Sequence, residues 1–159
     1  MCWHCDNPGK TRDDYLIEEV RPLIRKYGWM VQTVERGIGQ PGFAYTVGLT
    51  DAGLPELVVT GLRERRSGQL LNYFAQQVVR SGPPESGEVL PAAVGWPAFE
   101  VVPLSSPSAH LITAVLMYGD EFRALQLVYE DERGNWPWDR EFRGGTGGQP
   151  VLGARCRGH

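Results

Sequence analysis

The chain has 159 residues, of which 42% are hydrophobic and 22% are charged, as is typical of a globular protein of one domain. Its formal net charge of −3 disfavours a nucleic-acid-binding protein, because neutralising backbone phosphates requires an excess of basic residues. The longest apolar stretch, residues 111–118, is far shorter than the roughly 20 residues of a membrane-spanning helix. We therefore expect a single domain over residues 1–159 that partners with neither nucleic acid nor a membrane.

The N-terminus and the cysteines favour a cytoplasmic protein. Residues 1–5 contain neither the basic start and apolar stretch nor the small-residue cleavage site of a secretory signal. The three cysteines stand at the two ends of the chain, which does not resemble the disulfide framework of a secreted fold.

The first part of the chain predicts a helix followed by a β-hairpin. Thr11 and Asp14 have the spacing of a capping arrangement at the start of a helix over residues 11–27. Pro22 lies inside this helix and should kink it or end it early. A turn rich in glycine and proline then joins two β-type segments, residues 29–35 and 43–50, which predicts an antiparallel pair.

The remaining elements alternate between strands and helices. Strands are expected at residues 56–62, 99–104 and 123–130, and helices at residues 64–80 and 109–119, the latter capped by Ser108; a polar loop runs to about residue 92. This order favours an α+β fold, with a mixed or mainly antiparallel sheet and about three helices packed on it. Residues 1–10 and 144–159 are expected to be irregular.

Strings of residues along nearly the whole chain, taken together, resemble one family. They are MCWHCDNPG (1–9), FAYTVGLT (43–50), LPELVVTGL (54–62), HL (110–111), YG (118–119), ALQLV (124–128), WPW (136–138) and GQPVLG (148–153). The family is the "domain of unknown function 4262". The resemblance implies a small bacterial cytoplasmic protein, most typical of actinobacteria, and implies no activity. Asn7 departs from it, because we expect a histidine near that position.

The two ends of the chain carry a possible metal-binding set. Cys2 and Cys5 form a C-x-x-C pair, and Cys156 and His159 form a C-x-x-H pair. Two such pairs supply the three cysteines and one histidine of a common structural zinc site, and the ends of a domain often lie near each other. The sequence thus predicts a Zn²⁺ ion joining the termini. Exposed reduced thiols are the alternative, and a redox-active C-x-x-C is a further one.

Three titratable residues are candidates for acid–base catalysis: Tyr45, Glu56 and His110. Glu56 follows a proline and can act as a general base, although such a residue more often caps a strand or pairs with an arginine. His110 lies near a predicted helix start, where the helix dipole favours the neutral imidazole that can serve as a base. A catalytic role requires the three side chains to converge in one pocket.

Five residues are candidates for ligand binding: Tyr45, Thr46, Gln126, Trp136 and Trp138. The first three are polar residues in apolar strand segments, where they can line a pocket on the sheet. The tryptophans flank a proline and can stack on a ligand, anchor a partner or plug the core.

We expect a sheet pocket closed by residues 136–138, in a binding or regulatory domain for a small molecule or peptide. The alternatives are a small enzyme that uses Tyr45, Glu56 and His110, and a protein–protein interaction module anchored by Trp136 and Trp138. The oligomeric state is left open.

Overall fold

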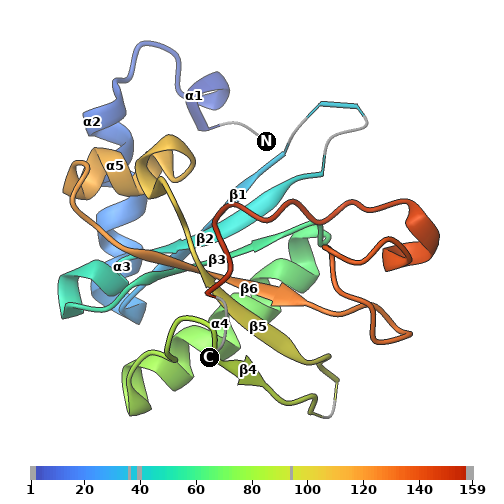
Figure 1. The fold of residues 1–159 in the computed structure, drawn as a ribbon. Coiled ribbons are helices and arrows are strands. Elements are labelled where there is room, and N and C mark those ends of the chain that lie inside the picture. The colour runs from blue at the N-terminus through green and yellow to red at the C-terminus, as the bar shows by residue number, and fades with distance from the viewer. Residues whose placement is uncertain (1–2, 36, 39–40, 94, 157–159) are drawn as a thin grey trace.

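A mixed six-stranded sheet with the order β1-β2-β3-β6-β5-β4 forms the centre of the computed structural model (Figure 1). The model describes residues 3–35, 37–38, 41–93 and 95–156. The strands are β1 (Met30–Val34), β2 (Phe43–Val47), β3 (Glu56–Thr60), β4 (Val89–Leu90), β5 (Phe99–Pro103) and β6 (Ala124–Tyr129). The α-helices are α1 (Trp3–Asp6), α2 (Arg12–Tyr15), α3 (Arg21–Tyr27), α4 (Glu64–Ser81) and α5 (Ile112–Tyr118). The predicted α+β class, with helices on a mixed sheet, is confirmed.

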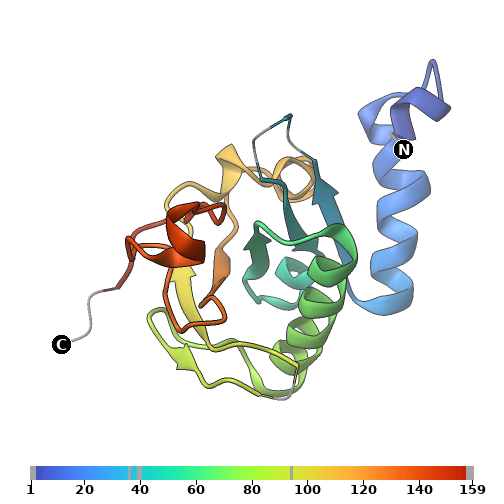
Figure 2. The ribbon, with the colours of Figure 1, turned by 90° about the vertical axis from the view of Figure 1, so that its right-hand side faces the viewer.

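The N-terminal helix begins at a capping box, as the sequence predicts. The Thr11 hydroxyl accepts the N–H of Asp14, whose carboxylate in turn accepts the N–H of Thr11. A π-helical segment, η1 (Leu16–Val20), lies between α2 and α3, so that the three form one continuous helix (Figure 2). The chain therefore accommodates Pro22, which lacks an N–H, by widening the preceding turn of the helix.

The strand pairing places two strand ends together. β1 and β2 form the predicted antiparallel hairpin, with Gln32 opposite Tyr45. β3 and β6, which are far apart in the sequence, are parallel neighbours, with Val58 opposite Gln126. The carboxyl ends of β3 and β6 therefore lie next to each other, at the same end of the strands.

Helices cover both faces of the sheet. Helix α4 packs against one face of the sheet. Every second residue of the central strands points to this face, among them Leu57, Val59, Leu125 and Leu127. The N-terminal helix and α5 pack against the other face through a second cluster that includes Leu16, Val20, Tyr45, Val58 and Ala114. Because the central strands are buried on both sides, their sequences are nearly continuous runs of apolar residues.

The end of the chain lies on the sheet without regular secondary structure. We call residues 146–156 the C-terminal strap. The Gln149 side chain exchanges two hydrogen bonds with the backbone of Tyr129, and the Gln126 amide bonds the carbonyl of Pro150 and the N–H of Leu152. The strap is thus irregular, as expected, and is fastened by two side-chain amides that act in place of a neighbouring strand.

Three local expectations are wrong. The segment 1–10 is not irregular throughout, because Trp3–Asp6 form the short helix α1. Ser108 does not cap a helix over residues 109–119: it lies inside a 3-10 segment, η3 (Pro107–Ala109), and α5 begins only after Leu111. The polar loop expected up to residue 92 contains the short strand β4. Among the described residues, no helix has the length and apolar character needed to cross a bilayer.

Candidate functional site

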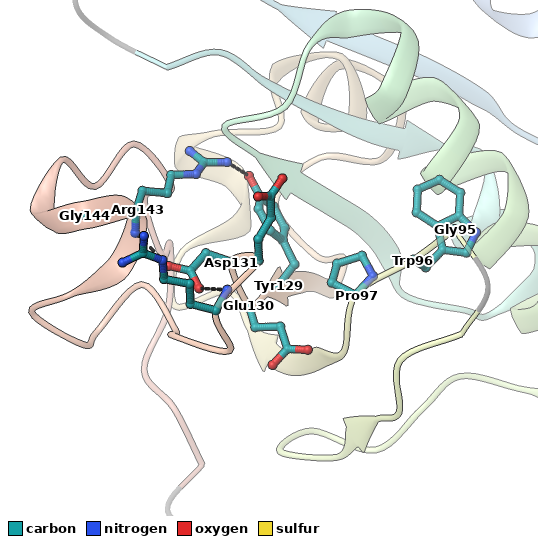
Figure 3. A pocket seen from close by; sticks show the side chains of 10 residues that line it. Gly95, Trp96, Pro97, Tyr129, Glu130, Asp131, Arg143 and Gly144 are labelled. Carbon is teal, nitrogen blue, oxygen red and sulfur yellow. Dashed lines mark hydrogen bonds between the residues drawn. The ribbon is translucent and has the colours of Figure 1, made fainter.

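A pocket of about 660 Å³ lies at the carboxyl end of β6 (Figure 3). Its lining comes from three segments, residues 95–97, 129–133 and 143–144. The first precedes β5, the second is the end of β6 with the turn that follows, and the third belongs to the 3-10 segment η4 (Phe142–Gly145). The carboxyl ends of parallel strands are a common place for ligand sites in sheets that carry helices.

Asp131 organises the backbone around this pocket. One carboxylate oxygen accepts the N–H groups of Arg133 (2.8 Å) and Asn135 (2.9 Å), and the other accepts the N–H of Arg143 (2.8 Å). The hydrogen bond from Arg143, followed by those from the turn, lowers the pKa of the Asp131 carboxyl below its ordinary value. The ionised carboxylate therefore ties η4 to the turn after β6.

Arg143 occupies an unusual backbone conformation, with φ 50° and ψ 43°. It is the single non-glycine residue with positive φ in the described part of the chain. A left-handed conformation of this kind costs on the order of 1–3 kcal/mol and is concentrated at functional sites. The hydrogen bond to Asp131 helps to hold Arg143 in this strained conformation.

The Arg143 guanidinium is positioned by neutral groups. It donates to the Tyr129 hydroxyl at 2.9 Å (Figure 3) and more weakly to the carbonyls of Gly61 (3.4 Å) and Gly147 (3.5 Å). Arg143 is half-buried and forms no ion pair with another described residue. The pocket therefore contains an oriented positive charge that lacks a carboxylate partner in this part of the structure.

Tyr129 links this charge to the end of β3. Its hydroxyl donates to the carbonyl of Thr60 at 2.9 Å while it accepts from Arg143. Burial raises the pKa of Tyr129, and the neighbouring guanidinium opposes this rise only in part. The phenol thus stays protonated at neutral pH and serves as a polar part of the pocket lining.

The wall across the pocket from Arg143 is apolar and aromatic. Figure 3 shows Trp96 and Pro97 on this side. The Arg66 guanidinium lies 3.8 Å from the centre of the Trp96 ring and donates to the carbonyl of Gly95, which fixes the orientation of the indole. The pocket combines this flat apolar surface with charged groups: Arg133 and Arg143 contribute guanidinium groups to the lining, and Glu130, Asp131 and Glu132 contribute carboxylates.

The structure places Glu56 in the core, outside the pocket. Its side chain is fully buried and accepts five hydrogen bonds, from the hydroxyls of Thr46 and Thr50 and the N–H groups of Gly48, Leu49 and Thr50. These backbone groups belong to the start of the 3-10 segment η2 (Leu49–Ala52). Burial raises the pKa of the Glu56 carboxyl, and the hydrogen bonds oppose this rise. The geometry makes Glu56 a structural anchor for η2.

The other two catalytic candidates lie elsewhere. The buried Tyr45 hydroxyl accepts the N–H of Thr113 at 2.9 Å, at the start of α5. His110 is partly exposed at the end of η3. Within the described residues no hydrogen bond joins Tyr45, Glu56 and His110, and the Tyr45 and Glu56 side chains are bonded to other, structural partners. Their catalytic role stays a prediction.

The remaining candidate ligand residues have structural partners. The Thr46 hydroxyl donates to Glu56 and accepts the N–H of Leu57, and the Gln126 amide holds the C-terminal strap. The rings of Trp136 and Trp138 stack in parallel, 5.6 Å apart, and do not line the pocket described above. Their predicted roles in binding a ligand or a partner therefore stay predictions.

The proposed zinc ligands are described only in part. Cys2 and His159 lie outside the described residues. Cys5 belongs to α1, whereas Cys156 lies beside Gly87, and Figure 2 shows α1 and the described end of the strap on opposite sides of the molecule. Among the described residues no group of three or more histidine, cysteine or acidic side chains is placed to hold a metal ion. The zinc site stays a prediction.

Sequence reasoning missed the residues that form the pocket. The hydrogen bond between Asp131 and the backbone of Arg143, twelve positions along the chain, has no sequence signature. The one available signal was the glycine pair after Arg143, because glycines mark backbone that takes left-handed conformations. Trp96 lies in a loop rich in proline and glycine, without any pattern that distinguishes it from a core residue.

Comparison with known proteins identifies a family but no characterised relative. Searches of curated proteins and of solved structures found no match to the chain. The family described as a domain of unknown function, DUF4262, matches residues 23–143, about three-quarters of the chain, in agreement with the resemblance found in the sequence. The matched range includes β1 to β6 and ends at Arg143, before the C-terminal strap. The chain therefore belongs to the DUF4262 family.

Proposed function

We propose that this protein binds a small organic anion in the pocket at the carboxyl end of β6. The ligand carries a carboxylate or phosphate group that contacts Arg143 and a flat apolar body that lies against Trp96 and Pro97. The observation that carries the proposal is the strained, half-buried Arg143, whose guanidinium has no acidic partner among the described residues.

The physical argument rests on preorganisation. A guanidinium held by Tyr129 and two carbonyls loses little side-chain entropy when an anion arrives, so more of the interaction energy appears as affinity. Arginine also offers several donors in a plane, which match the oxygens of a carboxylate or phosphate. The left-handed backbone conformation of Arg143 has a cost in free energy, and such conformations are concentrated at functional sites.

The same geometry favours binding over acid–base catalysis. The Asp131 carboxylate is occupied by three backbone N–H groups, and the Tyr129 hydroxyl both donates and accepts a structural hydrogen bond. Neither group is free to exchange a proton with a ligand without breaking a contact that shapes the pocket. The proposal thus agrees with the small-molecule binding domain expected from the sequence, at a different set of residues.

A ligand screen with a matched pair of variants tests this proposal. The wild-type protein is screened by thermal shift against aromatic and aliphatic carboxylates, amino acids, sugar phosphates and nucleotides, and hits are measured by calorimetry. Arg143→Asn removes the charge but tolerates the left-handed backbone, and Arg140→Asn makes the same change at an exposed residue outside the pocket.

We expect an anionic hit whose affinity falls roughly 10- to 100-fold in Arg143→Asn, as for the loss of one charged hydrogen-bonding partner, and is unchanged in Arg140→Asn. A screen without hits, or equal affinity in both variants, would contradict the proposal.

A further inference from the structure

The two edges of the six-stranded sheet differ in how they are protected. β4, at one edge, has only two residues and is flanked by Glu88 and Pro91. β1, at the other edge, has five residues, Met30-Val31-Gln32-Thr33-Val34, without a charge or a proline (Figure 1). Short strands, charges and prolines are the usual devices that prevent a free edge from pairing. β1 lacks all three.

The register identifies which backbone groups of β1 face away from the sheet. The N–H of Gly61 donates to the carbonyl of Gly42, which makes this a hydrogen-bonded pair and sets the alternation along β2. Phe43, Tyr45 and Val47 therefore direct their backbone groups toward β1 rather than toward β3.

Their partners in β1 are Val34, Gln32 and Met30, so Val31 and Thr33 turn their N–H and carbonyl groups outward. The N–H groups of Val31 and Thr33 have no hydrogen-bond partner among the described residues, and the Thr33 carbonyl accepts only the Gln32 side-chain amide. These outward groups have the spacing that a further strand requires.

A cleft of about 730 Å³ runs beside this edge. Residues 32–35 line it on one side, and Trp3, Tyr15, Ile112 and Leu116 contribute aromatic and aliphatic side chains to its lining. The Trp3 and Tyr15 rings pack together with their centres 5.1 Å apart. The cleft thus offers apolar contacts next to unpaired backbone groups, the combination used by domains that bind an extended peptide as an added strand.

Charge at one end of the cleft points to the composition of the peptide. The lining of the cleft holds two carboxylates, Glu35 and Glu64, and one guanidinium, Arg12; neither carboxylate forms an ion pair with a described residue. Glu64 accepts only a long hydrogen bond, 3.4 Å, from the Thr33 hydroxyl. Two carboxylates beside the last outward-facing residue of β1 favour a basic side chain at the corresponding position of the partner.

We propose that the free edge of β1 binds an extended peptide as a seventh strand, with a lysine or arginine directed to Glu35 and Glu64 and an apolar side chain against Trp3 and Tyr15. The proposal is independent of the anion pocket, because the two linings share no residue.

The test starts from a phage-displayed library of random ten-residue peptides selected on the full chain, followed by binding measurements with the best synthetic peptide. Residue-resolved amide exchange is then followed by NMR without and with that peptide. We expect the amides of Val31 and Thr33 to exchange quickly in the free protein and to become protected on binding, whereas Gln32 and Val34 are protected in both states.

Two variants separate this geometry from general loss of structure. Thr33→Pro removes an outward N–H and leaves the bonds to β2 intact, and it should weaken binding at least tenfold. Glu35→Lys should lower the affinity for a basic peptide at least fivefold. Glu85→Lys makes the same charge change at an exposed site near β4 and should leave the affinity unchanged. Thermal melts confirm that each variant is folded.

Three results would overturn the proposal. The first is a selection that enriches no peptide. The second is a bound peptide that leaves Val31 and Thr33 unprotected. The third is a concentration-dependent dimer that protects both amides without peptide, since a second copy of the chain then occupies the edge.

Discussion

Replacing Glu56 by glutamine tests whether this buried carboxylate anchors the fold. In the wild type one carboxylate oxygen accepts from the Thr46 hydroxyl and the Leu49 N–H, and the other accepts from Gly48 and Thr50. Glutamine keeps the shape but supplies one oxygen. If that oxygen stays with Thr50, which provides the shortest contacts, the NH₂ group faces the N–H of Leu49 and leaves it unpaired.

The expected cost follows from the donors that lose their acceptor. An unsatisfied buried N–H costs about 1–3 kcal/mol, and the remaining bonds weaken because their acceptor is no longer charged. Glu56→Gln should therefore lower the free energy of unfolding by roughly 2–4 kcal/mol. For a chain of this length the midpoint of thermal unfolding should fall by about 4–16 °C.

Urea denaturation followed by tryptophan fluorescence measures this change, with the exposed Glu121→Gln as the control. The slope of the unfolding free energy against urea concentration should be unchanged, because the substitution affects stability rather than the surface exposed on unfolding. A loss within about 0.5 kcal/mol of that of the control would refute the anchoring role, since such values are typical of surface substitutions.

Acid titration tests the turn after β6. Because the folded pKa of Asp131 lies below the ordinary value of 3.8, its stabilising effect is complete above that value and is lost as the pH falls through the folded pKa. The amide NMR shifts of Arg143 should therefore titrate with a midpoint below 3.8, and a higher midpoint would contradict the assignment. Two glycine substitutions should act in opposite directions on the urea midpoint. Gly153→Ala places a Cβ 1.9 Å from the Pro103 carbonyl oxygen and should cost about 1–3 kcal/mol by displacing the strap. Gly68→Ala, in open space within α4, should stabilise the protein by roughly 0.5–1 kcal/mol; changes of the same sign would contradict this account.

The elements that depend on local patterns were predictable from the sequence. The capping box at Thr11, the hairpin of β1 and β2 and the long helix α4 all follow from residues close together in the chain. The prediction that Ser108 caps a helix was wrong, because a 3-10 turn begins at Pro107 and the α-helix starts only at Ile112.

Non-local geometry was not predictable. The parallel pairing of β3 with β6 joins segments separated by two α-helices and two strands, and no residue pattern specifies that neighbour. The pocket depends on this pairing, since Arg143 reaches Tyr129 on β6 and Gly61 just after β3. Polar residues that looked available for a ligand, such as Glu56 and Gln126, were occupied by backbone partners that only the folded chain supplies.

Titration with a pair of small probes tests the anion pocket most directly. Benzoate presents a carboxylate on a flat ring, and benzyl alcohol presents a similar ring without the charge. Amide NMR spectra are recorded during each titration for the wild type and for Arg143→Asn. The account predicts that benzoate shifts the amides of Trp96 and Arg143, that benzyl alcohol binds more weakly, and that the variant loses the difference between them. Benzoate shifts confined to other parts of the chain, or equal responses to both probes in the wild type, would contradict it.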